Sequence, residues 1–254
     1  MTLYVDGSKI DVSHILIENA KVFIFCCINL FILFGSFVFT NIVYLTKGGI
    51  THMAANKEFQ YRKLHSLLGV IPVGIFLVQH LVVNHFATKG EEAFNQAAHF
   101  MESLPFRYAL EIFIIFLPIL FHAIYGLYIA FTAKTSVSRY GFFRNWMFVL
   151  QRVSGVVTLI FITWHVWETR IQAALGQKVD FNMMQDILSN PGMMVFYIVG
   201  VVSTIFHFAN GLWSFGVSWG LTVTPRSQRI STYVTLAIFF ALTFVGVRTL
   251  FAFA

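Results

Sequence analysis

Long apolar runs alternate with short polar stretches along most of this chain. Each run is long enough to cross the ~30 Å hydrocarbon core of a bilayer as a helix. Helices satisfy their own backbone hydrogen bonds in lipid, so we predict transmembrane helices rather than isolated strands. The runs lie at about 22–45, 64–86, 107–133, 148–168, 191–220 and 230–253.

Composition supports lipid as the solvent of this chain. Hydrophobic residues make up 57% of it and charged residues only 11%, with 30 phenylalanines. A soluble domain keeps roughly a quarter of its residues charged, which gives it a polar surface. The sequence therefore predicts an all-α integral membrane protein.

The formal net charge of +6 follows the connections between the apolar runs. Three connections are basic, through Lys57, Arg62 and Lys63, through Lys134, Arg139 and Arg144, and through Arg226 and Arg229. The alternate ones also hold acids, namely Glu91, Glu92 and Glu102, and Asp180 and Asp186. This is the positive-inside pattern, which argues against a nucleic-acid-binding protein. It predicts that the region before the 64–86 helix is cytoplasmic and that the C-terminus is outside.

Two cysteines, Cys26 and Cys27, are adjacent in the sequence. Adjacent cysteines do not make a disulfide framework, and the chain has no CxxCH motif for covalent haem attachment. They also cannot provide an iron–sulfur cluster site, and the chain has no dinucleotide-binding fingerprint.

A histidine pattern occurs twice along the chain. "FHAIYGLY" (121–128) and "FHFANGLW" (206–213) share Phe-His-x-x-x-Gly-Leu-aromatic, with His122 and His207 85 residues apart. His80 in "GIFLVQHLVVNH" and His165 in "LIFITWHVWETR" are also 85 residues apart. One offset for two separate pairs indicates a duplicated two-helix unit. We therefore predict a parallel repeat around a four-helix bundle within a five-helix membrane domain.

The depth of these histidines in the membrane sorts them into two levels. At 1.5 Å per residue, His80 lies ~8 Å below the outer surface, and His165 is similarly shallow. His122 and His207 each lie about 15 residues inside helices that enter from the outside, or ~22 Å deep. The two levels are thus roughly 15 Å apart.

Two histidines at one depth suit bis-imidazole ligation of haem iron, because a flat macrocycle needs one axial ligand from each side. Gly126 and Gly211 follow their histidines by one turn on the same face, where a missing side chain leaves room for a ring. Filling both axial positions favours electron transfer over oxygen binding. The alternative is that these histidines only form helix–helix hydrogen bonds.

Three further histidines, His65, His85 and His99, lie at membrane edges or in a loop, and we expect no ligand role for them.

From about Glu58 onward, the chain closely resembles the diheme cytochrome b subunit of bacterial succinate:menaquinone reductases, the single-anchor, five-helix type. The resemblance covers essentially all of 53–254. It runs through "RKLHSLLGVIPVG", "SLPFRYALEIFIIF", "TWHVWETR", "STIFHFANGLWSF" and "TPRSQRISTYVTL".

This resemblance implies a bacterial cytoplasmic-membrane anchor with two non-covalent b haems, bound by a flavoprotein subunit and an iron–sulfur subunit. It implies the axial pairs His80/His165 and His122/His207, which depth also gives. Electrons from succinate would pass through the inner and then the outer haem to menaquinone. Two alternatives stay open, a cytochrome b anchor of another respiratory dehydrogenase or hydrogenase, and a haem-free transporter with a histidine proton path.

Glu111 is the candidate proton donor for quinone reduction at the outer face. It lies four residues past Arg107, ~6 Å into the membrane, and eleven residues before His122, on the same predicted helix face. An intramembrane acid is a functional candidate by default. Glu168 is a second candidate for this step, with Arg170 steering its charge or binding a haem propionate. The alternative is that Glu111 only pairs with Arg107.

The join at "YLTKGGITHMAANKEF" (44–59) suggests a division of the chain. We expect Met53 to be the natural first residue, with 1–52 an upstream extension read in frame and 53–254 the diheme cytochrome b domain. The alternative is a genuine additional helix at 22–45, which the length of this N-terminal hydrophobic segment permits.

Overall fold

The computed structural model describes residues 2–5, 8–11 and 53–254, with side chains described from Lys57 onward. The chain divides into two units, Met1–Lys57 and Glu58–Ala254. In the first unit, β1 (Thr2–Val5) and β2 (Ser8–Asp11) form an antiparallel hairpin that we did not predict. The hydrophobic run at 22–45 lies outside the described residues.

Five helical spans in the described residues are long and apolar enough to cross a membrane, as predicted. The helices that build them, with their connections, are α2 (Met53–Val70), α3 (Pro72–Asn84), η2 (His85–Lys89), α4 (Glu91–Glu102), α5 (Arg107–Leu110), η3 (Glu111–Phe116), α6 (Leu117–Thr132), α7 (Phe143–Val166), η4 (Trp167–Ile171), α8 (Gln172–Ala174), α9 (Phe181–Leu188), α10 (Pro191–Ser218) and α11 (Pro225–Phe253). The integral membrane fold of five helices is therefore confirmed.

Local sequence signals set the starts of the last two spans. Asn190 caps α10 by accepting from the backbone N–H groups of Gly192 and Met193, and Pro191 takes the first helical position. Thr224 and Ser227 form a capping box at the start of α11, again with proline next to the cap. Proline suits this position because its missing N–H would have no partner there.

The first three spans each contain irregular backbone, next to a proline in the first two. Pro72 begins α3 after a break at Ile71, since proline cannot donate the next helical hydrogen bond. Pro118 follows η3, a π-helical stretch in the second span. A second π-helical stretch, η4, interrupts the third span between α7 and α8.

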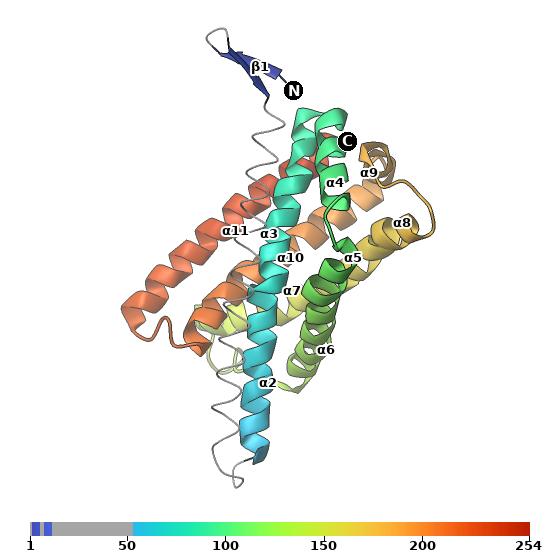
Figure 1. Ribbon diagram of the computed structural model, residues 1–254. Helices are drawn as coiled ribbons and strands as arrows, with labels where there is room; N and C mark the ends of the chain where they lie inside the picture. Colours follow the sequence, from blue (N-terminus) through green and yellow to red (C-terminus); the bar gives the residue numbers. More distant parts are fainter. Residues whose placement is uncertain (1, 6–7, 12–52) are drawn as a thin grey trace. The chain divides into compact units, whose positions relative to one another are not determined.

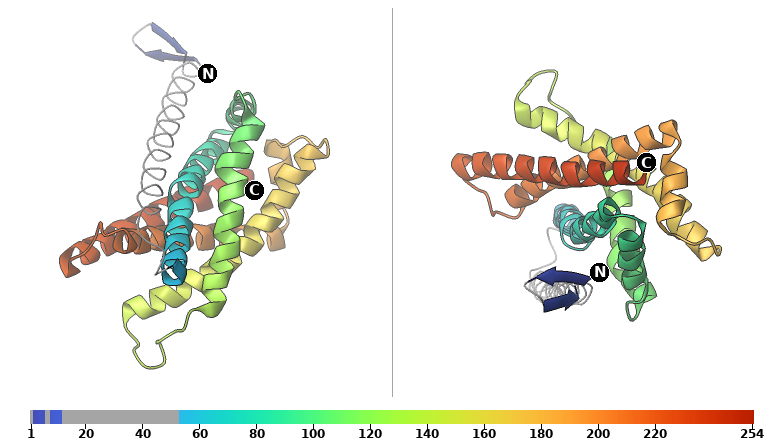
Figure 2. Two further views of the ribbon diagram at one scale, coloured as in Figure 1. Left: turned by 60° about the horizontal axis from the view of Figure 1, so that its bottom comes forward. Right: turned by 90° about the horizontal axis from the view of Figure 1, so that it is seen from above.

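The helices that carry the repeat pack around one another. Contacts join α3 to α6, α6 to α7, and α7 to α10, while α11 packs along α10 and against α3 (Figure 1). Figure 2 shows α10 and α11 lying along each other from two further directions. The start of α2 and the α6–α7 and α10–α11 connections form what we term the basic end. The acidic end comprises η2, α4, α8, α9 and the end of α11.

Burial is concentrated at the acidic end. A cluster of buried residues joins η2, α4, α9 and α11, including Ala87, Phe94, Phe181, Leu188 and Phe253. Elsewhere many large apolar side chains are exposed, among them Phe113, Ile124, Phe131, Ile160, Phe240 and Phe244. An apolar outer surface is what a lipid-facing bundle requires.

Candidate functional site

Both histidine pairs predicted from the repeat come together inside the bundle. The ring centres of His80 on α3 and His165 on α7 are 5.9 Å apart. Those of His122 on α6 and His207 on α10 are 6.0 Å apart. Two imidazoles bound to one metal at ~2 Å each have ring centres roughly 6 Å apart, so both separations fit a shared iron.

The Nδ1 atoms of three of these histidines already have hydrogen-bond partners. His122 Nδ1 lies 2.9 Å from the backbone oxygen of His65, and His207 Nδ1 lies 3.0 Å from that of Gln151. His165 Nδ1 lies 3.3 Å from the Tyr197 hydroxyl. A carbonyl oxygen only accepts, so in the neutral rings of His122 and His207 the proton sits on Nδ1. Nε2 keeps its lone pair, which is the arrangement of a metal-ligating histidine.

In the repeated motif, Gly126 and Gly211 leave space for the side chains of His65 and Gln151, whose backbone oxygens contact the histidine rings. A Cβ on Gly126 would lie 3.1 Å from His65 Nε2, and one on Gly211 would lie 3.5 Å from Gln151 Nε2. Each glycine therefore faces the residue whose carbonyl accepts from the histidine one turn earlier. Their nearest neighbours are thus orienting residues rather than the histidine rings.

Two other glycines lie directly against the rings of His122 and His207. A Cβ on Gly69 would lie 2.4 Å from His122 Cε1, and one on Gly155 would lie 2.9 Å from His207 Cε1. Any side chain there would displace the imidazole. Gly69 and Gly155 are 86 residues apart, as are His65 and Gln151. The repeat thus extends to the supporting residues, a signal we missed because His65 matches a glutamine.

We expected no ligand role for His65, and the structure gives it a supporting position. Its ring stacks on His122 with centres 4.1 Å apart and planes 7° apart. Gln151 has the equivalent place beside His207, where its side-chain amide donates to the His207 backbone oxygen and accepts from Asn210. These contacts fix the position of each ring in the pair nearer the basic end.

Arg152 on α7 carries a charge without a partner. Its Nε and Nη2 atoms are fully buried and have no hydrogen-bond partner among the described residues. Its guanidinium carbon lies 3.9 Å from the centre of the Phe148 ring. Arg152 is one turn from Gly155, which touches His207. Buried N–H groups without a hydrogen-bond partner are costly, so this position fits a cofactor that brings its own carboxylate.

In the part of the chain that the structure describes, no three or more His, Cys, Asp or Glu residues gather as a set of metal ligands. Haem needs only two axial protein ligands, because the porphyrin supplies the other four. The paired histidines, their engaged Nδ1 atoms and the unpartnered Arg152 therefore fit haem.

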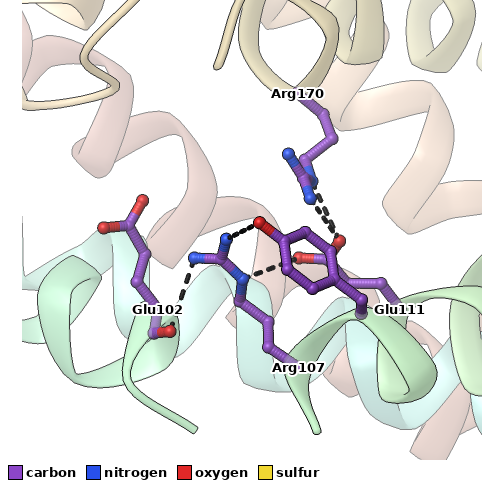
Figure 3. Close-up of polar contacts among 5 residues, drawn as sticks. Glu102, Arg107, Glu111 and Arg170 are labelled. Carbon is purple, nitrogen blue, oxygen red and sulfur yellow. Dashed lines mark hydrogen bonds and ion pairs between the residues drawn. The ribbon is translucent and has the colours of Figure 1, made fainter. Parts of the chain in front are cut away.

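Glu111 and Arg170 meet at the acidic end (Figure 3). Arg170 donates from Nε and Nη2 to Glu111 Oε2, at 3.0 and 2.7 Å. Arg107 is farther away, with Nε 3.9 Å from Glu111 Oε1. The main partner of Glu111 is thus Arg170 and not Arg107, the partner that the alternative reading gave it.

The two members of this ion pair lie on the two π-helical stretches, Glu111 on η3 and Arg170 on η4. A π bulge adds a residue to the helix and turns the remainder by about 100°. The eleven-residue spacing from Glu111 to His122 therefore does not give the shared face expected from a regular α-helix. π bulges occur frequently at functional sites.

A shallow, open pocket of about 470 Å³ lies next to this cluster, lined by Glu102, Leu104, Phe106, Arg107, Tyr108 and Ala109. Neither Glu111 nor Arg170 lines it, and Arg107 is the residue that connects it to Glu111. Arg107 donates to the Tyr108 hydroxyl at 2.9 Å and to the Glu102 backbone oxygen at 3.4 Å (Figure 3). The Tyr108 ring has the guanidinium of Arg107 at 4.7 Å and that of Arg170 at 5.7 Å. Aromatic and cationic groups thus border an opening next to a carboxylate.

Glu168, the second candidate acid, lies in a different contact. Tyr197 donates its hydroxyl hydrogen to Glu168 Oε2 at 2.9 Å. Arg170 pairs with Glu111 instead of Glu168. The three candidate residues therefore divide into a Glu111–Arg170 pair and a Glu168 that reaches His165 through Tyr197.

Comparisons with known proteins identify the family of the chain. Residues 132–246 match the family described as succinate dehydrogenase/fumarate reductase transmembrane subunit. The chain is also 71% identical, over 201 residues, to the succinate dehydrogenase cytochrome b558 subunit of Bacillus subtilis (strain 168). The match covers 79% of this chain and 100% of that relative. With this identity over most of its length, the chain belongs to the cytochrome b membrane-anchor subunits of succinate dehydrogenase.

Proposed function

We propose that this chain conducts electrons across the bacterial cytoplasmic membrane, from the iron–sulfur subunit of succinate dehydrogenase to menaquinone. Two b haems would be held by His122 with His207 near the basic end and by His80 with His165 near the acidic end. A flavoprotein subunit would oxidise succinate. The observation that carries this proposal is the pair of histidine–histidine contacts, 5.9 and 6.0 Å between ring centres.

Each haem supplies reversible one-electron transfer at its iron. The chain engages three of the four imidazoles at Nδ1, through the backbone oxygens of His65 and Gln151 and the Tyr197 hydroxyl, which leaves the Nε2 atoms of these rings available to iron. Gly69 and Gly155 leave space for the rings at their closest approach. Arg152 would neutralise a propionate of the haem between His122 and His207.

The positive-inside pattern supports an orientation with the basic end in the cytoplasm and the acidic end outside. The basic end would then meet the iron–sulfur subunit. Menaquinone would be reduced at the acidic end, near the pocket beside Arg107 and Tyr108.

Reduction of menaquinone to menaquinol takes up two electrons and two protons. Glu111 is the group that would pass protons to the quinone, because it is a carboxylate within the apolar span and lies next to Arg107, which lines the pocket. Arg170 and Arg107 hold it in place. Tyr108 offers an aromatic ring and a hydroxyl to a quinone in the same pocket.

The test is a spectrum of the purified complex with its haem and subunit content. We expect two b-type haems per copy of this chain, both reduced by succinate, and menaquinone-dependent reoxidation of both. Reduction by another respiratory donor and not by succinate would point to a different dehydrogenase. A complex without a b-type band would overturn the haem assignment.

A further inference from the structure

The histidine nearest the acidic end of α7 is connected to a carboxylate through one buried tyrosine. Tyr197 is 2% exposed, and its hydroxyl lies 3.3 Å from His165 Nδ1 and 2.9 Å from Glu168 Oε2. A hydroxyl donates one hydrogen and can accept others. Since the carboxylate takes the tyrosine hydrogen, the tyrosine oxygen is left to accept from His165 Nδ1–H.

The surroundings hold Tyr197 and His165 in this geometry. Phe161 stacks on His165 with ring centres 5.7 Å apart and packs edge-on against Tyr197 at 5.3 Å. A Cβ on Gly200 would lie 2.2 Å from Phe161, so glycine is what lets this ring fit against α10. The histidine is thus held by a stacked ring on one side and a hydroxyl on the other.

The other ligand histidines have different partners. His122 and His207 donate to backbone carbonyl oxygens, which carry no net charge. In the described residues, the His80 ring has no corresponding hydrogen bond. Of the four ligand histidines, His165 is therefore the one with a hydrogen-bonded connection to a carboxylate in the described structure.

We propose that Tyr197 and Glu168 are positioning residues that set the reduction potential of the haem held by His80 and His165. This inference rests on the proposed function. The Glu168 carboxylate accepts the Tyr197 hydrogen and so makes the tyrosine oxygen a stronger hydrogen-bond acceptor. That oxygen then accepts more strongly from His165 Nδ1–H. The imidazole becomes a more basic ligand, which stabilises ferric iron over ferrous iron. The hydrogen bonds from His165 through Tyr197 to Glu168 therefore lower the reduction potential of this haem.

The experiment is an equilibrium redox titration of the purified complex carrying Tyr197→Phe, Glu168→Gln or both changes. Tyr197→Phe should make ferrous iron about tenfold more favourable in one haem, an upward shift of ~59 mV for one electron. Glu168→Gln should shift the same haem upward by a smaller amount. The second haem should keep its potential in both variants.

The double variant separates a hydrogen-bonded connection from a simple charge effect. Because Glu168 acts through Tyr197, Glu168→Gln should add nothing in the Tyr197→Phe background. An equal shift in both backgrounds would mean that Glu168 acts through space, and the proposal would be wrong. No shift in either single variant would also overturn it.

Controls repeat the same chemical changes away from the ligands. Tyr233→Phe on the exposed face of α11 and Asp186→Asn on α9 should leave both potentials unchanged. If the Tyr197→Phe complex does not retain the haem, the shift in reduction potential in Glu168→Gln is the deciding measurement, since this substitution preserves size and hydrogen bonding. A wild-type complex without two haems would instead contradict the proposed function.

Discussion

Arg170 Nη2 lies 2.7 Å from Glu111 Oε2, which joins the π-helical stretch of the second span to that of the third. The two side chains are 30% and 21% exposed, so the pair lies at the edge of the packed bundle. An ion pair in this position fixes a carboxylate next to Arg107, which lines the pocket. It is also a salt bridge between two spans that carry opposite halves of the histidine repeat.

We expect Glu111→Gln to keep both haems bound and reducible by succinate while menaquinone reduction falls at least ~10-fold. Glutamine preserves the size of the side chain and its ability to hydrogen-bond, but it removes the carboxyl group that can take up and release a proton. The measurement is succinate:menaquinone turnover beside succinate-dependent haem reduction in the same preparation.

A matched control is Glu92→Gln, which alters an exposed acid on α4 that accepts from Gln96. Its quinone turnover should equal that of the wild type. Unchanged turnover in Glu111→Gln would leave Glu111 as a structural partner of Arg170.

Replacing single ligand histidines should remove single haems. His122→Ala or His207→Ala should abolish binding of the haem near the basic end. His80→Ala or His165→Ala should abolish binding of the haem near the acidic end. Each change leaves iron one axial bond short in an apolar pocket, so loss of the haem is expected. Haem content and low-spin spectra measure this, and four variants that all keep two low-spin haems would disprove the assignment.

Gly69→Ala and Gly155→Ala should lower occupancy of the haem between His122 and His207. Their Cβ atoms would lie 2.4 and 2.9 Å from the two imidazoles, closer than a methyl group can be placed. We expect haem content to fall toward one per complex. Gly141→Ala is the control, because a Cβ there meets nothing within 4 Å, and equal haem loss in it would point to a general folding defect.

Arg152→Gln should lower the midpoint potential of the haem between His122 and His207 and leave the other potential unchanged. Removing the positive charge proposed to neutralise a propionate would stabilise ferric iron relative to ferrous iron. Arg152→Lys should restore most of the potential, since it returns the charge without the planar guanidinium. A redox titration in which both variants match the wild type would rule out this contact.

Met53 as the natural first residue stays a prediction. Mass spectrometry of the subunit from its native membrane should find an N-terminal peptide that begins at or just after Met53. A peptide from residues 1–20 in the mature protein would contradict it and favour the additional helix at 22–45.

The contacts between His80 and His165 and between His122 and His207 were predictable, because two identical offsets and a constant helical rise determine which rings share a level. The supporting residues were not, because His65 and Gln151 differ in residue type and are 86 rather than 85 residues apart. Both hold their histidine through a backbone carbonyl, and every residue type has one, so residue identity gives no sign of it.

The contacts among Glu111, Arg107 and Arg170 were predictable only where both residues lie on one helix. Arg107 was an obvious partner for Glu111 because it lies one turn away on the same helix. Arg170 is 59 residues away in the sequence and reaches Glu111 only because of how the two spans pack. A regular α-helical count also fails across η3, and no residue type marks a π bulge in a sequence.

Each of the two π-helical stretches divides its span into two halves, and the rotation of the outer half about the helix axis does not affect the position of the inner half. On both spans the histidine lies to the basic side of the bulge and the charged residue lies on the bulge itself. Because the inserted residue sets the rotation of the outer half, removing it would turn the charges without moving the imidazoles. The gain or loss of a single residue near Glu111 and Arg170 would therefore reorient the proposed quinone site while the proposed haem ligands keep their positions.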